Sequence, residues 1–171
     1  MPEIPTSAVR DSDVLVSVHP SPIGPLTLMA RDGRLTDLVM QDQAHATPVP
    51  RGSRRDDAFF VEVARQLDEY FAGARSDFDL PLHLDGTLFQ QAVWAQLQAI
   101  PYGETISYGE LARRVGNPKA SRAVGLANGR NPIAVIVPCH RVIAADGTLG
   151  GYGGGPDRKT LLLELESAGH R

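Results

Sequence analysis

The chain has 171 residues, of which 42% are hydrophobic and 22% charged, with a formal net charge of −3. This composition is typical of a folded globular protein and excludes a disordered or fibrous one. No apolar run approaches the roughly 18 residues that a membrane-spanning helix needs. The opening MPEIPTSAVRDSD lacks the basic and apolar regions of a signal peptide. The single cysteine cannot form an internal disulfide, so we expect a cytoplasmic protein.

The charge is distributed unevenly along the chain. Residues 1–85 carry 8 arginines and 14 acidic residues, a net charge of −6, whereas residues 86–171 carry 9 basic and 6 acidic residues, a net charge of +3. A polyanion would be attracted to the second half and repelled by the first. Ordinary compositional scatter explains the same difference equally well.

We expect two domains, 13–85 and 86–171, after a flexible tail at 1–12. Short β-rich runs separated by turn residues predict strands in the first domain. A further strand is predicted at 77–84, at a sheet edge because it contains Pro81. The three earlier predicted strands are 14–19, 24–32 and 34–41.

The first domain also contains one amphipathic helix. Apolar residues recur at helical spacing over 60–71, with Asp56 or Asp57 as the predicted N-cap. We find no chemistry in this half beyond that of a scaffold. Its histidines are scattered, without the spacing of ligands: His19, His45 and His83.

The second half begins with two helices that have clear start signals. Thr87 with Gln90, and Ser107 with Glu110, have the spacing of capping boxes. The second of these helices ends near Gly116. The first places four apolar residues on one face: Phe89, Val93, Leu97 and Ile100.

A third helix follows after a short turn that contains glycine, which is the pattern of a helix-turn-helix. Asn117 is its predicted N-cap and Pro118 its first residue. Arg122 is the one long side chain in the middle of a surface of small residues. A tightly packed interior helix with one solvated arginine explains this pattern as well as a close approach to another backbone does. The small residues are Ala120, Ser121, Ala123, Gly125 and Ala127.

The end of the chain contains the only cysteine. The apolar run 133–138 predicts a buried strand that leads into Cys139. A glycine-rich loop over 144–157 follows, and a closing helix over 158–170 carries Glu166 at its flank.

Spacing excludes several cysteine chemistries. The zinc deaminase signature Pro-Cys-x-x-Cys fails because Val142 occupies the second cysteine position. One cysteine also excludes a zinc finger, a redox Cys-x-x-Cys pair and an iron–sulfur site. An inert buried thiol and a nucleophile both remain, because a reactive thiol needs a neighbouring base and His140 is adjacent to Cys139.

The second half resembles the O6-alkylguanine-DNA alkyltransferases, also called methylated-DNA–protein-cysteine methyltransferases. Their core motif Pro-Cys-His-Arg-Val is present at 138–142. The resemblance runs from about 89 to 166 and includes PYGETISYGELA, GNPKASRAVGLANGRNPIAVIVPCHRVI and GYGGG. It implies an α/β (α+β) fold, with a small N-terminal sheet-and-helix domain and a mainly helical C-terminal domain.

The resemblance also implies a single-turnover transfer that consumes the protein. An alkyl group on O6 of a flipped-out guanine, and on O4 of thymine, would pass to Cys139. His140 would take the thiol proton through a water, and Glu166 would hold His140. Tyr108 would donate to N3 of the guanine, and Asn131 would support the active-site turn.

Four further residues receive roles around the substrate by the same resemblance. Backbone carbonyls near Val137 and Cys139 would accept from the exocyclic amine of the guanine. The loop at Tyr152 and Gly153 would close over the lesion with backbone N–H donors. Some relatives have serine at the position of Gly153, so a hydroxyl contact would be missing. Arg122 would fill the gap that the flipped base leaves.

The partner implied is double-stranded DNA that carries O6-alkylguanine. The helix of small residues would lie in the minor groove, which is only about 6 Å wide. Lys119 would contact a phosphate. The DNA-binding surface would otherwise consist of Ala120, Ser121, Ala123, Gly125 and Ala127.

No cofactor, metal or membrane partner is expected. Some relatives bind zinc in the N-terminal domain through cysteine, and this half has none. We expect a monomer, with clustering on DNA left open. The alternative function is a module that binds alkylated DNA without transfer, and a helix-turn-helix regulator is a third class. The presence of Cys139 favours transfer.

Overall fold

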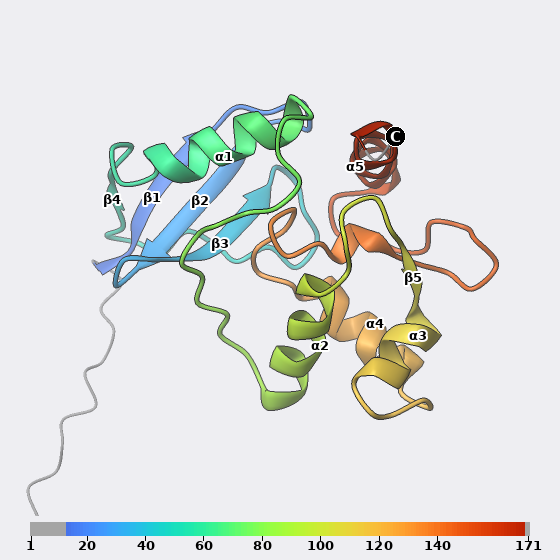
Figure 1. Cartoon of the computed structure of the whole chain (residues 1–171). Helices are drawn as coiled ribbons and strands as arrows, with labels where there is room; N and C mark the ends of the chain where they lie inside the picture. Colours follow the sequence, from blue (N-terminus) through green and yellow to red (C-terminus); the bar gives the residue numbers. More distant parts are fainter. Residues whose placement is uncertain (1–12, 170–171) are drawn as a thin grey trace, which may run out of the picture.

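A computed structural model describes residues 13–169, so the tail predicted at 1–12 lies outside the described residues. A sheet covered by α1 lies beside a helical half that contains α2, α3 and α4 (Figure 1). The strands are β1 (Leu15–His19), β2 (Leu26–Arg31), β3 (Arg34–Met40), β4 (Arg54–Arg55), β5 (Ile106–Ser107) and β6 (Val142–Ile143). The helices are α1 (Val61–Phe71), α2 (Leu88–Gln98), α3 (Tyr108–Arg114), α4 (Ser121–Gly129), the short 3₁₀ helix η2 (Cys139–Arg141) and α5 (Pro156–Gly169).

The first sheet has the order β3-β2-β1-β4. The three predicted strands are confirmed as β1, β2 and β3, which pair antiparallel, and β4 adds two residues parallel to β1. The strand predicted at 77–84 is wrong, because only an isolated bridge between Leu82 and Leu35 forms there. Pro81 has no N–H to extend a ladder, although its carbonyl accepts the Leu35 N–H at 2.9 Å.

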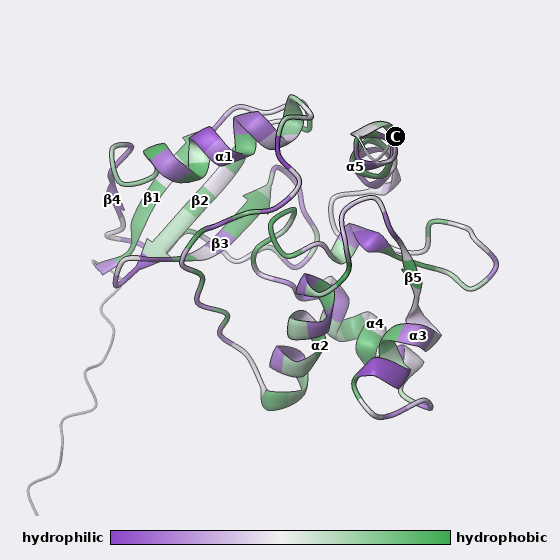
Figure 2. Cartoon of the chain, viewed as in Figure 1, coloured by the Kyte–Doolittle hydropathy of each residue, from purple (hydrophilic) through white to green (hydrophobic). Residues whose placement is uncertain are grey.

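Helix α1 forms as predicted but begins differently. Its N-cap is Phe60, without a side-chain hydrogen bond, while the Asp56 carboxylate accepts the N–H of Phe59 at 3.1 Å. Leu67 and Tyr70 on its inner face are fully buried. The alternation of hydrophilic and hydrophobic residues along this helix is visible in Figure 2.

The capping signals of the second half are confirmed in part. Thr87 and Gln90 form a reciprocal capping box at the start of α2. Ser107 accepts the Glu110 N–H at the start of α3, but the Glu110 carboxylate instead pairs with arginines on its own helix. Phe89 is 38% exposed, so it is not buried with the other three residues of the predicted apolar face.

Helix α4 begins at Ser121, three residues later than predicted. The carbonyl of Asn117 accepts the Ala120 N–H at 3.0 Å, and this turn precedes the helix. The helices α3 and α4 pack together through a short connection, which agrees with a helix-turn-helix.

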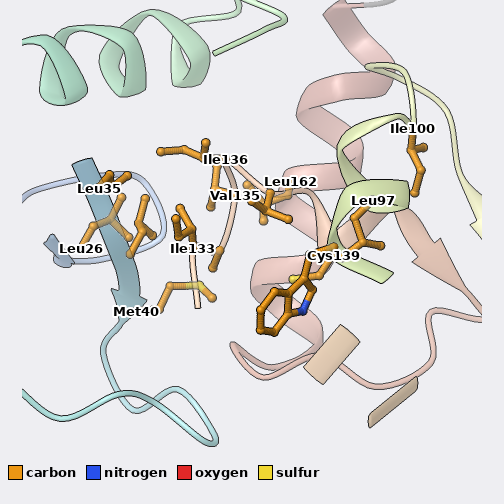
Figure 3. Packing of buried hydrophobic residues seen from close by; sticks show 14 of the residues in the cluster. Leu26, Leu35, Met40, Leu97, Ile100, Ile133, Val135, Ile136, Cys139 and Leu162 are labelled. Atoms are coloured by element: carbon orange, nitrogen blue, oxygen red, sulfur yellow. The ribbon is translucent and has the colours of Figure 1, made fainter. Parts of the chain in front are cut away.

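The strand predicted at 133–138 is also wrong, although the segment is buried. Ile133 makes only an isolated bridge to Leu38, and Val135 has a left-handed φ of 71° that breaks any strand. The segment therefore touches β3 at Leu38 and then turns at Val135, so it does not continue as a strand. It is part of one hydrophobic cluster that includes residues of both halves, among them Leu26, Leu35, Leu97 and Cys139 (Figure 3).

Within residues 13–169, no helix has the length and apolar character to cross a membrane.

Candidate active site

Cys139 lies where both halves of the chain meet. It is the first residue of η2, directly after Pro138, and its side chain is 6% exposed. It lines a pocket of about 460 Å³ that is mostly apolar. The pocket is lined from the N-terminal half by Met40 and Gln43 to His45, and from the C-terminal half by Tyr108, Gly125, Leu126, Asn128 to Asn131, Ala134, Cys139 and Gly151 to Gly154.

Next to Cys139, a buried ionic cluster surrounds Glu166. His140 Nε2 lies 2.7 Å from Glu166 Oε2, and both side chains are at most 1% exposed. Arg141 donates to both carboxylate oxygens, from Nε at 2.6 Å and from Nη2 at 3.1 Å. Burial by itself raises the pKa of Glu166, but the hydrogen bonds from His140 and Arg141 lower it to about 2. Glu166 is therefore an anion at neutral pH.

His140 is a neutral base in this environment. Burial lowers its pKa, although the hydrogen bond to Glu166 opposes that effect. A neutral imidazole beside a carboxylate carries its proton on the nitrogen that faces the carboxylate, here Nε2. Nδ1 then has a free lone pair, and it is buried without a hydrogen-bond partner among the described residues. The histidine thus has one vacant acceptor.

Cys139 is a protonated thiol that needs activation. Burial raises its pKa, while a hydrogen bond from Asn131 and the charge of Lys159 lower it less strongly. A thiol of this kind requires a base to become a nucleophile. His140 is the next residue, and its buried Nδ1 has no hydrogen-bond partner among the described residues.

Asn131 holds the turn that carries Cys139. Its Nδ2 donates to the Val137 carbonyl at 2.7 Å, and its Oδ1 accepts the Ile133 N–H at 3.0 Å. The Val137 carbonyl also accepts the Cys139 N–H at 2.9 Å. Both of its lone pairs are therefore engaged. In this structure the Val137 carbonyl supports the turn, and a contact from it to the substrate stays a prediction.

The other predicted substrate residues do line the pocket. Tyr108, Tyr152 and Gly153 all contribute to its surface. The Tyr108 hydroxyl donates to the Gly151 carbonyl at 3.4 Å, so it connects α3 with the glycine-rich loop. Burial raises the pKa of Tyr108, which keeps the phenol protonated and able to donate.

Most of the residues predicted to contact DNA are accessible on α4 or just before it, with one correction. Ser121, Arg122 and Ala123 are exposed, as is Lys119 in the turn before them, and Ala120 is half-buried. Gly125 lines the pocket. Ala127 is 3% exposed and its carbonyl accepts the Trp94 indole N–H at 2.9 Å, so it faces the core. The prediction that Ala127 contacts DNA is wrong because its side chain is turned inward.

Sequence reasoning missed Lys159, which is fully buried. Its ammonium donates to the Val142 carbonyl at 2.7 Å and to the Gly151 carbonyl at 3.3 Å, and burial lowers its pKa to about 8. A signal existed, because Lys159, Leu162 and Glu166 share one face of α5 at i, i+3 and i+7. Lys159 ties the glycine-rich loop to the strand that follows Cys139.

Asn128 and Tyr70 were also missed. Asn128 Nδ2 donates to the Cys139 carbonyl at 3.3 Å, and Tyr70 in α1 donates to Glu166 at 2.7 Å. Asn128 lies near the C-terminal end of α4, the helix of small residues, and its polar amide was the sequence signal that could have indicated its role. Nothing in the sequence pairs Tyr70 with Glu166.

Both halves of the chain match parts of one family. Residues 88–168 match the family described as 6-O-methylguanine DNA methyltransferase, DNA binding domain. Residues 14–84 match 6-O-methylguanine DNA methyltransferase, ribonuclease-like domain.

Individual proteins resemble the chain over most of its length. The methylated-DNA–protein-cysteine methyltransferase of Mycolicibacterium paratuberculosis is 57% identical over 146 residues, which are 85% of this chain and 88% of that protein. The protein of the same name from Methanosarcina acetivorans is 51% identical over 152 residues, or 89% and 97% of the two chains. The crystal structure of Mycobacterium tuberculosis OGT in complex with DNA superposes with a TM-score of 0.86 at 54% identity, covering 91% of this chain and 94% of that one. The chain belongs to the 6-O-methylguanine DNA methyltransferase family.

Proposed function

We propose that the protein repairs DNA by direct reversal, transferring the alkyl group of O6-alkylguanine irreversibly to Cys139. The observation that carries this proposal is the buried thiol in a mostly apolar pocket, next to a neutral histidine with a vacant acceptor. The family, whose relatives are named methylated-DNA–protein-cysteine methyltransferases, supports it.

The reaction follows from the protonation states of the site. The thiol proton of Cys139 passes to Nδ1 of His140 through a water, and Glu166 stabilises the resulting imidazolium. The thiolate attacks the alkyl carbon, so that an S–C bond forms while the C–O6 bond breaks. The bonding electron pair of C–O6 goes to the guanine.

Two further proton movements complete the balance. Tyr108 donates its proton to N3, so the guanine leaves as a neutral base. Solvent then returns the proton on His140 to Tyr108. The S-alkyl thioether has no ready leaving chemistry, so one chain accepts one alkyl group and no cofactor takes part.

Double-stranded DNA is the partner in this proposal. The exposed start of α4, with Ser121, Arg122 and Ala123, would enter the minor groove, where small side chains allow a close approach. Arg122 would occupy the gap in the base stack, and Lys119 would contact a phosphate. The solved complex of Mycobacterium tuberculosis OGT with DNA supports a nucleic-acid partner. We propose that a monomer binds.

The decisive experiment incubates the protein with a duplex that contains O6-methylguanine. We expect one methylene of added mass on the peptide that contains Cys139, in a one-to-one amount, and an unmodified guanine in the DNA. Binding of the duplex without any mass gain would instead assign the protein to the modules that recognise alkylated DNA.

A further inference from the structure

Four residues of the N-terminal half line the pocket that contains Cys139. They lie at the end of β3 and in the turn that follows it, and we call them the pocket wall: Met40, Gln43, Ala44 and His45. From the sequence alone, this half is assigned only a scaffold role. The inference below rests on the proposed transfer to Cys139.

The pocket wall has a defined backbone conformation. The Met40 N–H donates to Gln43 Oε1 at 3.0 Å, and the Gln43 N–H donates to the Met40 carbonyl at 3.3 Å. Asp42 and His45 have left-handed φ angles of 59° and 58°, which Asp and His adopt more readily than most residues. Such conformations persist where the surrounding structure holds them.

The pocket wall also contacts the glycine-rich loop directly. The Ala44 N–H donates to the Gly153 carbonyl at 2.9 Å. A Cβ at Gly153 would lie 3.4 Å from both the Ala44 carbonyl oxygen and Gln43 Cγ. A Cβ at Gly154 would lie 2.6 Å from Met40 Cε, so a side chain at this position would have to displace the end of the Met40 side chain.

We propose that the pocket wall positions the glycine-rich loop and limits the size of the alkyl groups that reach Cys139. The N-terminal half then takes part in substrate selection. The physical reason is geometric: the wall is built on the buried Met40 at the end of a sheet strand, whereas the loop it contacts is rich in glycine. A group that enters the pocket must fit between fixed surfaces.

The first test adds bulk to the wall. Ala44→Phe leaves the backbone N–H to Gly153 in place but fills part of the pocket. We expect the ratio of single-turnover rates for free O6-benzylguanine and O6-methylguanine to fall roughly tenfold. Gln41→Phe is the matched control, because Gln41 is an exposed residue of the same turn that contacts Arg158 through its carbonyl. An unchanged ratio in Ala44→Phe, or an equal fall in Gln41→Phe, would overturn the proposal.

The second test displaces the loop from the wall. Gly154→Ala places a methyl group against Met40, whereas a Cβ at Gly109 in α3, outside the pocket lining, meets only side-chain atoms at 3.8 Å. We expect transfer to slow in Gly154→Ala, to remain near wild type in Gly109→Ala, and to recover in part when Met40→Ala is added to Gly154→Ala. Thermal melts check that each variant folds. Equal loss in both glycine variants, or no recovery in the double variant, would contradict the positioning role.

A third measurement separates this inference from the proposed function. Cys139 is the only cysteine, so its alkylation by iodoacetamide and by N-benzyliodoacetamide can be followed by mass without any guanine substrate. The ratio of the bulky to the small reagent should fall in Ala44→Phe and stay constant in Gln41→Phe. If wild type fails to react with alkylated guanine, the proposed function is wrong. If the ratio of alkylation rates for the bulky and the small reagent does not change in Ala44→Phe, the proposal that the pocket wall limits the size of entering groups is wrong.

Discussion

The phenol of Tyr70 donates a hydrogen bond of 2.7 Å to Oε2 of Glu166, joining α1 of the N-terminal half to α5. The same oxygen lies 2.7 Å from His140 Nε2 and accepts from Arg141 Nη2 at 3.1 Å. Burial raises the pKa of Tyr70, and the negative charge of Glu166 raises it further, so the phenol remains a donor. The carboxylate that contacts His140 is therefore held partly by the other half of the chain.

Tyr70→Phe should lower the free energy of unfolding by about 1.5–3 kcal/mol, the usual range for a hydrogen bond to a charged group. His140 and Arg141 still hold Glu166 in this variant, so the transfer rate should change much less than in Glu166→Gln. Urea unfolding and single-turnover transfer measure the two effects. Unchanged stability would mean that water replaces the phenol.

Glu166→Gln should slow transfer by raising the pKa of Cys139. A neutral amide stabilises the imidazolium of His140 less well, so less thiolate forms at neutral pH. Each unit by which the pKa of Cys139 rises lowers the thiolate fraction roughly tenfold. The more basic thiolate is about threefold more nucleophilic, which offsets part of this loss in rate. The rate should therefore recover as the pH rises. Measurement runs from about pH 6 to pH 9.5, and an equal reduction at every pH would contradict the proton-relay role.

The charge of Glu166 should also appear in acid stability. Its folded-state pKa of about 2 lies below the ordinary value of 4.5. The stabilisation of the folded state by the Glu166 charge is therefore complete above pH 4.5 and is lost as the pH falls through 2. It amounts to at most about 3 kcal/mol. The difference in unfolding free energy between wild type and Glu166→Gln should narrow across this interval, and a constant difference down to pH 2 would show that Glu166 is already protonated or that its charge does not stabilise the fold.

Cys139→Ser should abolish alkyl transfer while leaving DNA affinity nearly unchanged. The thiol is the only cysteine and lies in the pocket, whereas Arg122 and its neighbours lie at the exposed start of α4. Mass spectrometry and a duplex-binding titration measure the two properties. Continued repair by the serine variant would show that another atom accepts the alkyl group.

Arg122→Ala should slow repair of duplex DNA much more than reaction with free O6-benzylguanine. Extruding a base costs a few kcal/mol of stacking, which an inserted side chain offsets in part, and a free base needs no extrusion. The two rates are measured by single turnover on the same preparation. Equal losses on both substrates would instead assign Arg122 to the folding of α4.

The sequence by itself determined the features that depend on short spacing. The capping box at Thr87 and Gln90, the strands at β1, β2 and β3, and the position of His140 directly after the only cysteine all follow from residues close together in the chain. The link from His140 to Glu166 came from the resemblance to a known family, and their distance of 2.7 Å agrees with it.

Only the tertiary structure decided which distant groups meet. In the folded chain Ala127 and Lys159 are buried, and the Val137 carbonyl is hydrogen-bonded within the turn. Tyr70 is hydrogen-bonded to Glu166. The tertiary structure also placed Met40 and its neighbours in the wall of the pocket. The physical reason is that these contacts join residues far apart in the chain, whose separation depends on how the sheet packs against the helices. Local periodicity and propensity carry no information about that packing.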